Sequence, residues 1–397
     1  MSPRPTPEPS DDAPGLFGPL ESDPPTPTPT PTPTRTPRGG RTARTPLGPA
    51  NVPDDVRDLG ARLPQSLRLG TSSWSFPGWA GLVWSRAAES GELARDGLKA
   101  YAAHPLFRTV GLDRTYYRPM SAAALSDLRA NVAPGFRFLV KAHQACLRPT
   151  ISEHSTFGAS ESRVGDPNPV FLDPAYAIDQ VIEPCVRGLG AGTDGALGPI
   201  LFQFSPMSLR TLGGVDSLLD RLDAFLERLG PRGNGRDGRP LLAVEVRNAE
   251  LLTPRYESIL RRHGVCHAFS VHPSLPPPDA QAALLAGSAD RTALRALLVQ
   301  QPALVARWLL IEGQEYESAK HRYEPFDRIV DEDNRSRDLL AAMCARAVGA
   351  ARDAYVIINN KAEGSAPRSV ERLARAILER PPNPNPPIPP APTTHPA

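Results

Sequence analysis

Residues 241–248 read Leu-Leu-Ala-Val-Glu-Val-Arg-Asn, and this stretch gives the first indication of the fold. Side chains alternate between the two faces of a β-strand. The apolar residues 242, 244 and 246 therefore share one face, whereas Ala243, Glu245 and Arg247 share the other. The apolar face suits packing against helices, and the other face suits the inside of a barrel. There, Glu245 and Arg247 form either a functional pair or a structural ion pair.

Seven other apolar runs resemble strands, and segments with helical spacing separate them. The eight predicted strands are Leu67–Thr71, Arg108–Asp113, Phe136–Lys141, Ile200–Phe204, Leu241–Val246, Cys266–Val271, Arg307–Glu312 and Tyr355–Asn359. The predicted helices are Leu93–Ala103, Ser121–Asn131, Asp173–Leu189, Val215–Leu229, Thr253–His263, Asp279–Val299, Asn334–Ala350 and Ser365–Leu378. Alternating strands and helices imply parallel pairing. The prediction is an α/β fold, a (β/α)₈ TIM-barrel-like single domain, with a doubly wound open sheet as the alternative.

Proline marks the two ends of the chain. Of the 47 prolines, 24 lie in residues 1–50 and 381–397, including a Pro-Thr alternation from Pro25 to Pro33. These segments have too little apolar surface to offset the entropy lost on ordering. We therefore predict disordered tails over residues 1–62 and 381–397, with the barrel domain over 63–380. The alternative for the tails is a polyproline ligand for a partner protein.

Charge and cysteine usage exclude several classes of protein. The formal net charge is only +2, so the whole chain lacks the basic character that a nucleic-acid partner favours. The four cysteines are far apart and lack zinc-site spacing, which predicts buried thiols in a reducing compartment: Cys146, Cys185, Cys266 and Cys344. No run approaches the roughly 18 apolar residues of a membrane span. A cytoplasmic protein that does not contact a membrane is the expectation.

In parallel barrels, functional residues lie at the carboxyl ends of the strands. The third predicted strand places Lys141 and His143 on one face, where Lys141 could bind an anion or act as a base or imine-forming nucleophile. A solvated lysine at the rim is the alternative. The eighth strand ends in Asn359-Asn360-Lys361, before a Gly364-Ser365 turn that suits either phosphate binding or simple helix capping.

Aromatic residues follow the first predicted strand, where Trp74, Trp79 and Trp84 lie within eleven residues. They either stack on a ligand at the rim or plug the top of the barrel. The conceivable metal ligands have no recognisable spacing, so we predict no metal site and name no cofactor: Asp113, His143, Glu245, His272 and Glu312. Glu245 and Glu312 would be the carboxylate pair of a glycosidase only at a suitable separation.

Six motifs occur in order along the strands: Gly70-Thr71-Ser72-Ser73-Trp74, Thr115-Tyr116-Tyr117-Arg118, Phe136 to Lys141, Gly198 to Gln203, Val244 to Arg247, and Asn359-Asn360. Together they resemble the YecE-like family (domain of unknown function 72) over about Leu67 to Arg380. The resemblance implies a TIM-barrel-like fold and supplies no established reaction. A nucleic-acid-related role for the family rests on analogy with barrel endonucleases.

The chain also departs from the family pattern. Gly111 and Asp113 stand where the second strand usually has Glu and Asn, and Leu310 and Glu312 stand where the seventh has Arg and His. These departures imply a modified site, or none, if the usual residues take part in chemistry. A predicted loop that carries Gln314, Tyr316, Lys320 and Tyr323 then offers other polar groups.

Our leading hypothesis is an uncharacterised barrel enzyme that acts on a small polar or anionic ligand at the mouth. Glu245 would be the acid or base, and Lys141 and Arg247 would hold the anion. The remaining predicted ligand-binding residues are Ser72, Trp74, Asp113, Tyr117, His143, Gln203, Asn359 and Asn360. The alternatives are a nucleic-acid binder or nuclease, and a non-catalytic scaffold.

Overall fold

Eight parallel strands pair in chain order, and β8 pairs back with β1 to close a barrel. The strands are β1 Leu67–Thr71, β2 Thr109–Leu112, β3 Arg137–Lys141, β4 Leu197–Gln203, β5 Leu242–Glu245, β6 Cys266–Val271, β7 Ala303–Trp308 and β8 Asp353–Ile358. This computed structural model describes residues 46–151, 163–230, 233, 235, 237–288, 290, 292–311 and 313–380. The predicted (β/α)₈ fold is confirmed.

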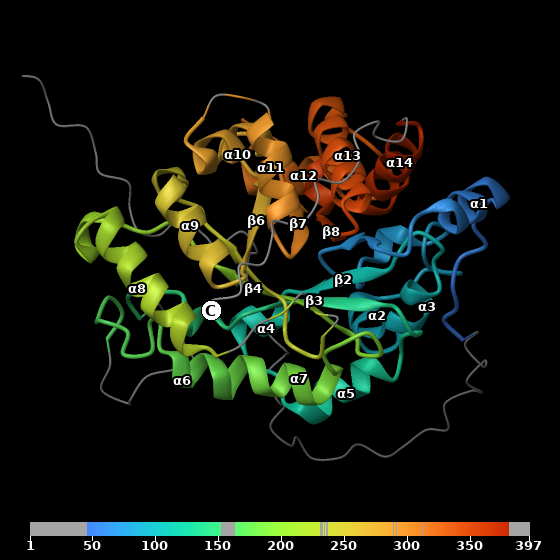
Figure 1. Cartoon of the computed structure of the whole chain (residues 1–397). Helices are drawn as coiled ribbons and strands as arrows, with labels where there is room; N and C mark the ends of the chain where they lie inside the picture. The colour runs from blue at the N-terminus through green and yellow to red at the C-terminus, as the bar shows by residue number, and fades with distance from the viewer. Residues whose placement is uncertain are drawn as a thin grey trace, which may run out of the picture. The chain divides into compact units, whose positions relative to one another are not determined.

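Helices surround the barrel and carry the chain from one strand to the next (Figure 1). They are α1 Asp54–Arg62, α2 Ser90–Asp96, α3 Leu98–Ala102, α4 Arg114–Tyr117, α5 Ala122–Arg129, α6 Pro174–Ala177, α7 Glu183–Leu189, α8 Val215–Arg228, α9 Pro254–Arg262, α10 Pro278–Ala286, α11 Thr292–Gln300, α12 Tyr316–Tyr323, α13 Asn334–Gly349 and α14 Ala366–Leu378. A π-helical segment, Ile178–Ile182, joins α6 to α7.

The predicted alternation of side chains holds in β5. Leu242 and Val244 belong to the large core between strands and helices, whereas Ala243 belongs to a separate apolar cluster. That second cluster is the inner layer of the barrel, contributed by alternate residues of several strands: Leu139, Leu201, Leu241, Ala243, Cys266, Ala268, Ala303, Val305, Tyr355 and Ile357. Barrel interiors are packed in this way rather than hollow.

Charged side chains lie on either side of the inner apolar layer. Near the amino ends of the strands, Arg68 and Asp353 form an ion pair at 3.0 Å, and the Arg68 guanidinium lies over the Tyr355 ring. At the carboxyl ends, the same inward face carries polar residues, beginning with Lys141 and Glu245. The layer therefore separates two charged ends, of which the carboxyl end is the mouth.

Helix α1 corrects the predicted N-terminal tail, which included residues 54–62. Val56 and Leu59 are buried, and Arg108 donates hydrogen bonds to the carbonyl oxygens of Gly60, Leu63 and Pro64 at 2.8, 3.2 and 2.6 Å. Two aspartates in the first turn favour the start of this helix. Residues 46–53 of the predicted tail are also described and include the buried Val52, whereas residues 1–45 and 381–397 lie outside the described residues.

Strand β7 also lies elsewhere than predicted. It spans Ala303–Trp308 and so begins four residues before the predicted Arg307–Glu312. After the strand ends, the backbone amides of Leu309 and Leu310 both donate hydrogen bonds to the Val271 carbonyl oxygen. The apolar run that follows Arg307 continues beyond the sheet, where Leu310 packs in a separate cluster. Arg307, the first residue of the predicted strand, lies near the carboxyl end of β7. Glu312 lies outside the described residues.

The segment after β7 forms α12 rather than the predicted loop. Leu310, Ala319, Tyr323 and Phe326 make a small buried cluster, against which Phe76 and Val330 pack. We call residues 313–330 the mouth cover, because Tyr316 lies over Lys361, just beyond the carboxyl end of β8. A Cβ on Gly78 would lie 1.7 Å from the Pro325 carbonyl oxygen, so the loop after β1 approaches the cover closely.

All four cysteines are free and buried, as predicted. None of the helices in the described ranges is long and apolar enough to cross a membrane.

Candidate functional site

Every strand of the barrel contributes a polar side chain at or near its carboxyl end. These positions continue the inward-facing alternation beyond the apolar layer. In chain order they are Ser72, Asp113, Lys141, Gln203, Glu245, Ser270, Arg307 and Asn359. Seven are buried, and Asp113 is partly exposed, with 17% of its side chain accessible. Solvent therefore reaches this ring of polar groups beside Asp113.

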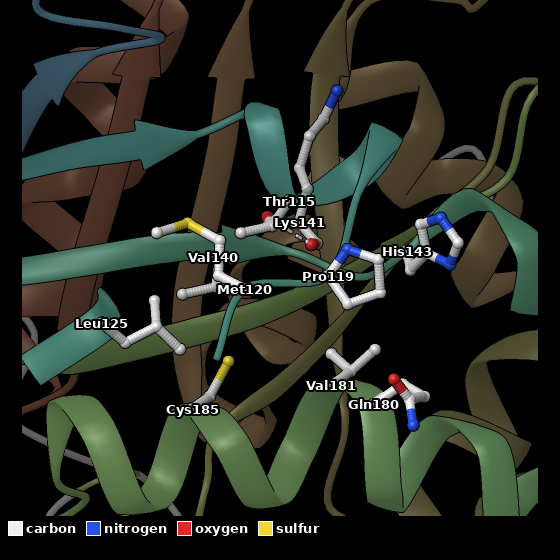
Figure 2. Close-up of a pocket in the computed structure, with 10 residues that line it drawn as sticks. All are labelled: Thr115, Pro119, Met120, Leu125, Val140, Lys141, His143, Gln180, Val181 and Cys185. Carbon is white, nitrogen blue, oxygen red and sulfur yellow. Dashed lines mark hydrogen bonds between the residues drawn. The ribbon is translucent and has the colours of Figure 1, made fainter. Parts of the chain in front are cut away.

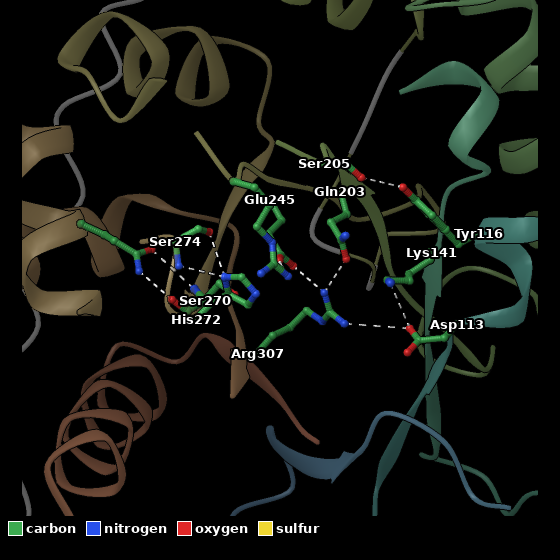
Figure 3. A network of polar contacts seen from close by, with 12 residues as sticks. Asp113, Tyr116, Lys141, Gln203, Ser205, Glu245, Ser270, His272, Ser274 and Arg307 are labelled. Carbon is green, nitrogen blue, oxygen red and sulfur yellow. Dashed lines mark hydrogen bonds and ion pairs between the residues drawn. The ribbon is translucent and has the colours of Figure 1, made fainter. Parts of the chain in front are cut away.

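Arg307, on β7, connects the ends of β4 and β5 across the mouth. Its Nη1 donates hydrogen bonds to Oε1 of Gln203 at 2.7 Å and to Oε2 of Glu245 at 2.8 Å (Figure 3). Sequence reasoning missed Arg307 because the apolar residues after it displaced the predicted strand. The alternation of Ala303, Val305 and Arg307 with Leu304, Ala306 and Trp308 was the signal that could have found it.

Glu245 is fully buried between two guanidinium groups. Its Oε1 lies 2.5 Å from Nη2 of Arg247, and its Oε2 pairs with Arg307. Burial would raise the pKa of Glu245, but the charges of Arg247 and Arg307 outweigh it and lower the pKa to about 2. The carboxylate is therefore ionised at neutral pH and fixes the positions of both arginines.

Lys141 lies beside this cluster on β3. Its Nζ is 3.5 Å from Oδ1 of Asp113 and 4.9 Å from the ring centre of Tyr116. Arg307 Nη2 lies 4.0 Å from the same Asp113 oxygen. Burial lowers the pKa of Lys141 to about 8, although Asp113 opposes this effect. A fraction of this amine is therefore neutral near physiological pH.

The buried charges at the mouth do not balance. Lys141, Arg247 and Arg307 are cationic, and the carboxylates that pair with them are Asp113 and Glu245. Arg307 is well compensated, because Glu245 and Asp113 outweigh the effect of burial and raise its pKa.

Arg247 is less well compensated than Arg307. Burial lowers its pKa despite the ion pair with Glu245. Its Nη2 has the Glu245 carboxylate at 2.5 Å, but its Nε and Nη1 have no hydrogen-bond acceptor among the described residues. Nearby, burial and the charge of Arg247 lower the pKa of His272 to about 3, so this histidine adds no charge at neutral pH.

Ser72 and Asn359 form a second, smaller pair across the β8–β1 junction. The Asn359 amide donates to the Ser72 hydroxyl at 3.3 Å. Asn360, by contrast, serves the fold: its side-chain oxygen accepts from the Trp79 indole at 3.2 Å and from the Ala366 amide at 2.9 Å, where α14 begins. The structure therefore does not bring the Asn360 side chain to the ring of polar groups.

The three tryptophans after β1 are buried in the main core, which favours the packing interpretation over a ligand platform. Trp74 donates its indole N–H to the Leu93 carbonyl oxygen at 3.1 Å, and the Arg114 guanidinium lies over its ring. These contacts hold the Trp74 indole in the main core.

His143 lies beside the mouth rather than within the charged cluster, whereas Tyr117 lies near that cluster, since burial and the charge of Asp113 raise the pKa of its hydroxyl. The His143 ring contacts the Tyr176 hydroxyl at 2.7 Å and the Tyr117 carbonyl oxygen at 3.2 Å. It also lines a void of about 10 Å³ between β3 and the helices α5 and α7 (Figure 2). This void can hold no more than one water molecule, and Lys141 extends its ammonium group away from it. The void is therefore not the predicted ligand site.

The mouth cover lies over the β8 side of the ring. Lys361 Nζ is 4.0 Å from the ring centre of Tyr316 and 5.8 Å from that of Phe326. Burial lowers the pKa of Lys361 to about 8. A cation held between aromatic rings is a stable packing arrangement, so Lys361 attaches the cover to the barrel.

Metal ligands are not assembled in the described part of the chain, where no group of three or more His, Cys, Asp or Glu side chains could hold an ion. His143 is held by its tyrosine and carbonyl contacts, and His272 hydrogen-bonds Ser274 at 2.8 Å. Of the four conceivable ligands that the structure describes, Asp113 and Glu245 form ion pairs in the charged cluster, and Glu312 lies outside the described residues.

A family model described as "Protein of unknown function DUF72" matches residues 68–394. Among solved structures, a DUF72 family protein from Enterococcus faecalis V583 is 17% identical with a TM-score of 0.51, over 80% of this chain and 98% of that chain. This similarity shows the fold alone.

More distant structures carry no argument. A DUF72 family protein from Thermotoga maritima MSB8 is 17% identical with a TM-score of 0.45, over 79% of this chain and 99% of that one. SacUVDE is 12% identical with a TM-score of 0.41, covering 73% and 86%. A search of curated proteins found no match. The family match spans most of the chain and confirms the resemblance seen in the strand motifs, so this protein belongs to the DUF72 family.

Proposed function

We propose that the mouth of the barrel binds a small anionic ligand, a carboxylate or a phosphate, on which the protein acts as an enzyme. The observation that carries the proposal is the imbalance of buried charge around Arg247. A buried charge is costly unless it is paired and hydrogen-bonded. An anion that accepts hydrogen bonds from Arg247 would supply the missing partner.

The arrangement of Arg247 and Arg307 suits such a ligand. Guanidinium groups bind carboxylate and phosphate oxygens through paired hydrogen bonds. Glu245 holds both arginines at the mouth through ion pairs, and Gln203 accepts a further hydrogen bond from Arg307. Donors fixed before the ligand arrives lose little entropy on binding.

The same geometry changes the role that we assign to Glu245. A carboxylate with a pKa of about 2 and two arginine partners is a poor proton donor near neutral pH. We therefore assign Glu245 to positioning the arginines. Lys141, with a pKa of about 8, is the better candidate for proton transfer.

Thermal unfolding with added anions tests this function. Phosphate, sulfate and malonate should raise the Tm of the full chain above the value in sodium chloride of equal ionic strength, because a ligand that binds only the folded state stabilises it. The increase should be lost in Arg247→Gln. The readout is the ligand-induced shift, so a lower starting Tm of the variant does not affect the comparison.

Arg255→Gln is the matched control. Arg255, on α9, forms ion pairs with Asp216 and Asp220 of α8, and its side chain is 43% exposed, whereas that of Arg247 is buried. This variant should keep the full anion-induced shift. Equal shifts in wild type and Arg247→Gln, or no shift with any anion, would reject the proposal.

A nucleic acid is the second candidate partner. Its phosphates share the chemistry of the proposed ligand, but the net charge of +2 does not favour it. If it were the true ligand, a single-stranded oligonucleotide would bind more tightly than phosphate, with a log affinity that falls with log salt.

A further inference from the structure

We propose that the anionic ligand is a 2-oxo acid, and that the Lys141 amine forms an imine with its carbonyl carbon while Arg247 holds its carboxylate. This inference rests on the proposed anion site and names the class of substrate. It follows from the placement of the Lys141 amine beside a buried cluster in which Glu245 links the Arg247 and Arg307 guanidinium groups.

The use of lysine in this chain is unusual. Only four of the 45 lysine and arginine residues are lysines: Lys99, Lys141, Lys320 and Lys361. Arginine supplies nearly every other positive charge, so a simple cation at the end of β3 would be expected to be arginine. Lysine differs in one relevant respect, because only its amine can lose a proton and attack a carbonyl carbon under mild conditions.

The surroundings of Lys141 suit that reaction. Nζ of Lys141 and Nη2 of Arg307 lie at 3.5 and 4.0 Å from the same oxygen of Asp113. Lys141 and Arg307 therefore both approach Asp113, at the place where solvent reaches the network, and Glu245 links Arg307 to Arg247. In a 2-oxo acid the carbonyl carbon is bonded directly to the carboxylate, which matches an amine next to a guanidinium.

The proton balance needs no group beyond those present. The Lys141 ammonium group first passes one proton to Asp113, and the neutral amine attacks the carbonyl carbon. A second proton moves from the nitrogen to the carbonyl oxygen to give a carbinolamine. The proton held by Asp113 then returns to the hydroxyl group, which leaves as water as the carbon–nitrogen double bond forms, and the third hydrogen of the ammonium group stays on the imine nitrogen. Nothing is oxidised or reduced. The protonated imine keeps the positive charge of the former ammonium group, so its ion pair with Asp113 survives.

Reductive trapping tests the inference. The full chain is incubated with pyruvate and sodium cyanoborohydride, which converts an imine into a stable secondary amine, and the adduct is mapped by peptide mass spectrometry. We expect one adduct, on Lys141, formed at least tenfold faster than on the other three lysines. The rate should rise with pH up to about 8, where burial leaves half of the Lys141 amine neutral.

Three variants make the result specific. Lys141→Met and Lys141→Arg should both lose the adduct, and the arginine variant keeps the cation beside Asp113. Lys361→Met is the matched control: Lys361 is also buried, with a pKa of about 8, but it lies against Tyr316 and Phe326. This variant should be labelled on Lys141 like the wild type.

The outcomes separate this inference from the anion site. If pyruvate raises the Tm of the wild type but no Lys141 adduct forms, the imine is rejected and the anion site stands. If pyruvate and phosphate both leave the Tm unchanged, the anion site fails as well. Labelling spread evenly over the four lysines would also overturn the imine.

Discussion

Replacing Glu245 by glutamine should destabilise the fold by about 3 kcal/mol at pH 7. The pKa of this carboxylate falls from 4.5 to about 2 on folding, and each pKa unit corresponds to about 1.4 kcal/mol. The variant also leaves Arg247, Arg307 and Lys141 with Asp113 as the remaining carboxylate of the cluster. Breaking a buried ion pair typically costs about 3–5 kcal/mol, in agreement with the estimate from the pKa.

The stabilisation that Glu245 provides should decrease as the pH falls. Because the folded pKa lies below the unfolded one, the stabilisation by Glu245 is complete above about pH 5 and is lost as the pH falls toward 2. The difference between wild type and Glu245→Gln should therefore shrink from about 3 kcal/mol at pH 7 to about 1 kcal/mol at pH 3.

Urea unfolding at both pH values measures this difference. Glu183→Gln is the control, because Glu183 pairs with Arg187 at 3.9 Å on the surface, where the two side chains are 52% and 66% exposed. It should lose less than about 0.5 kcal/mol. A Glu245→Gln variant as stable as this control, or a difference that does not change with pH, would refute the account of the buried cluster.

Three further outcomes follow from the packing. Gly78→Ala should cost about 1–3 kcal/mol and speed hydrogen exchange in Tyr316–Tyr323 but not in the strands, because the new Cβ would lie 1.7 Å from the Pro325 carbonyl oxygen; unchanged exchange in α12 would contradict this contact. Arg108→Met should cost about 1–3 kcal/mol and admit protease within α1, since three carbonyl oxygens lose the hydrogen bond from the guanidinium group; resistance to cleavage equal to wild type would argue against this anchor. The four cysteines, whose burial raises their pKa to about 12, should react with Ellman's reagent only after unfolding; rapid labelling of the native protein would show that a thiol is accessible.

Alternation along the strands allowed much of the site to be predicted. In β3 and β5 the inward face is set by a period of two, so Lys141, Glu245 and Arg247 could be assigned to one cluster from the sequence. Gln203 and Asp113 followed from the same rule at neighbouring strand ends. These predictions hold because a buried strand has one face for helices and one for the barrel interior.

Other features depend on long-range contacts that a local pattern cannot reveal. Leu310, which follows β7, packs in a separate apolar cluster and not in the sheet. Because the prediction used hydrophobicity alone, it placed β7 too late in the sequence. Asn360 looked like a ligand-binding residue, but it accepts hydrogen bonds from Trp79, 281 positions away, and from Ala366. Helix α1 was missed because the proline-rich composition around it outweighed a short amphipathic pattern.

The apolar layer within the barrel has a consequence for chemistry at the mouth. Leu139, Leu201 and Ile357 form a hydrocarbon floor beneath the charged cluster, and burial is the main cause of the lowered pKa of Lys141. Residues that never touch a ligand therefore help to set how strongly the amine holds its proton. A polar substitution in this floor would admit water, make the lysine more basic and slow its reactions as a nucleophile, with every residue of the mouth unchanged.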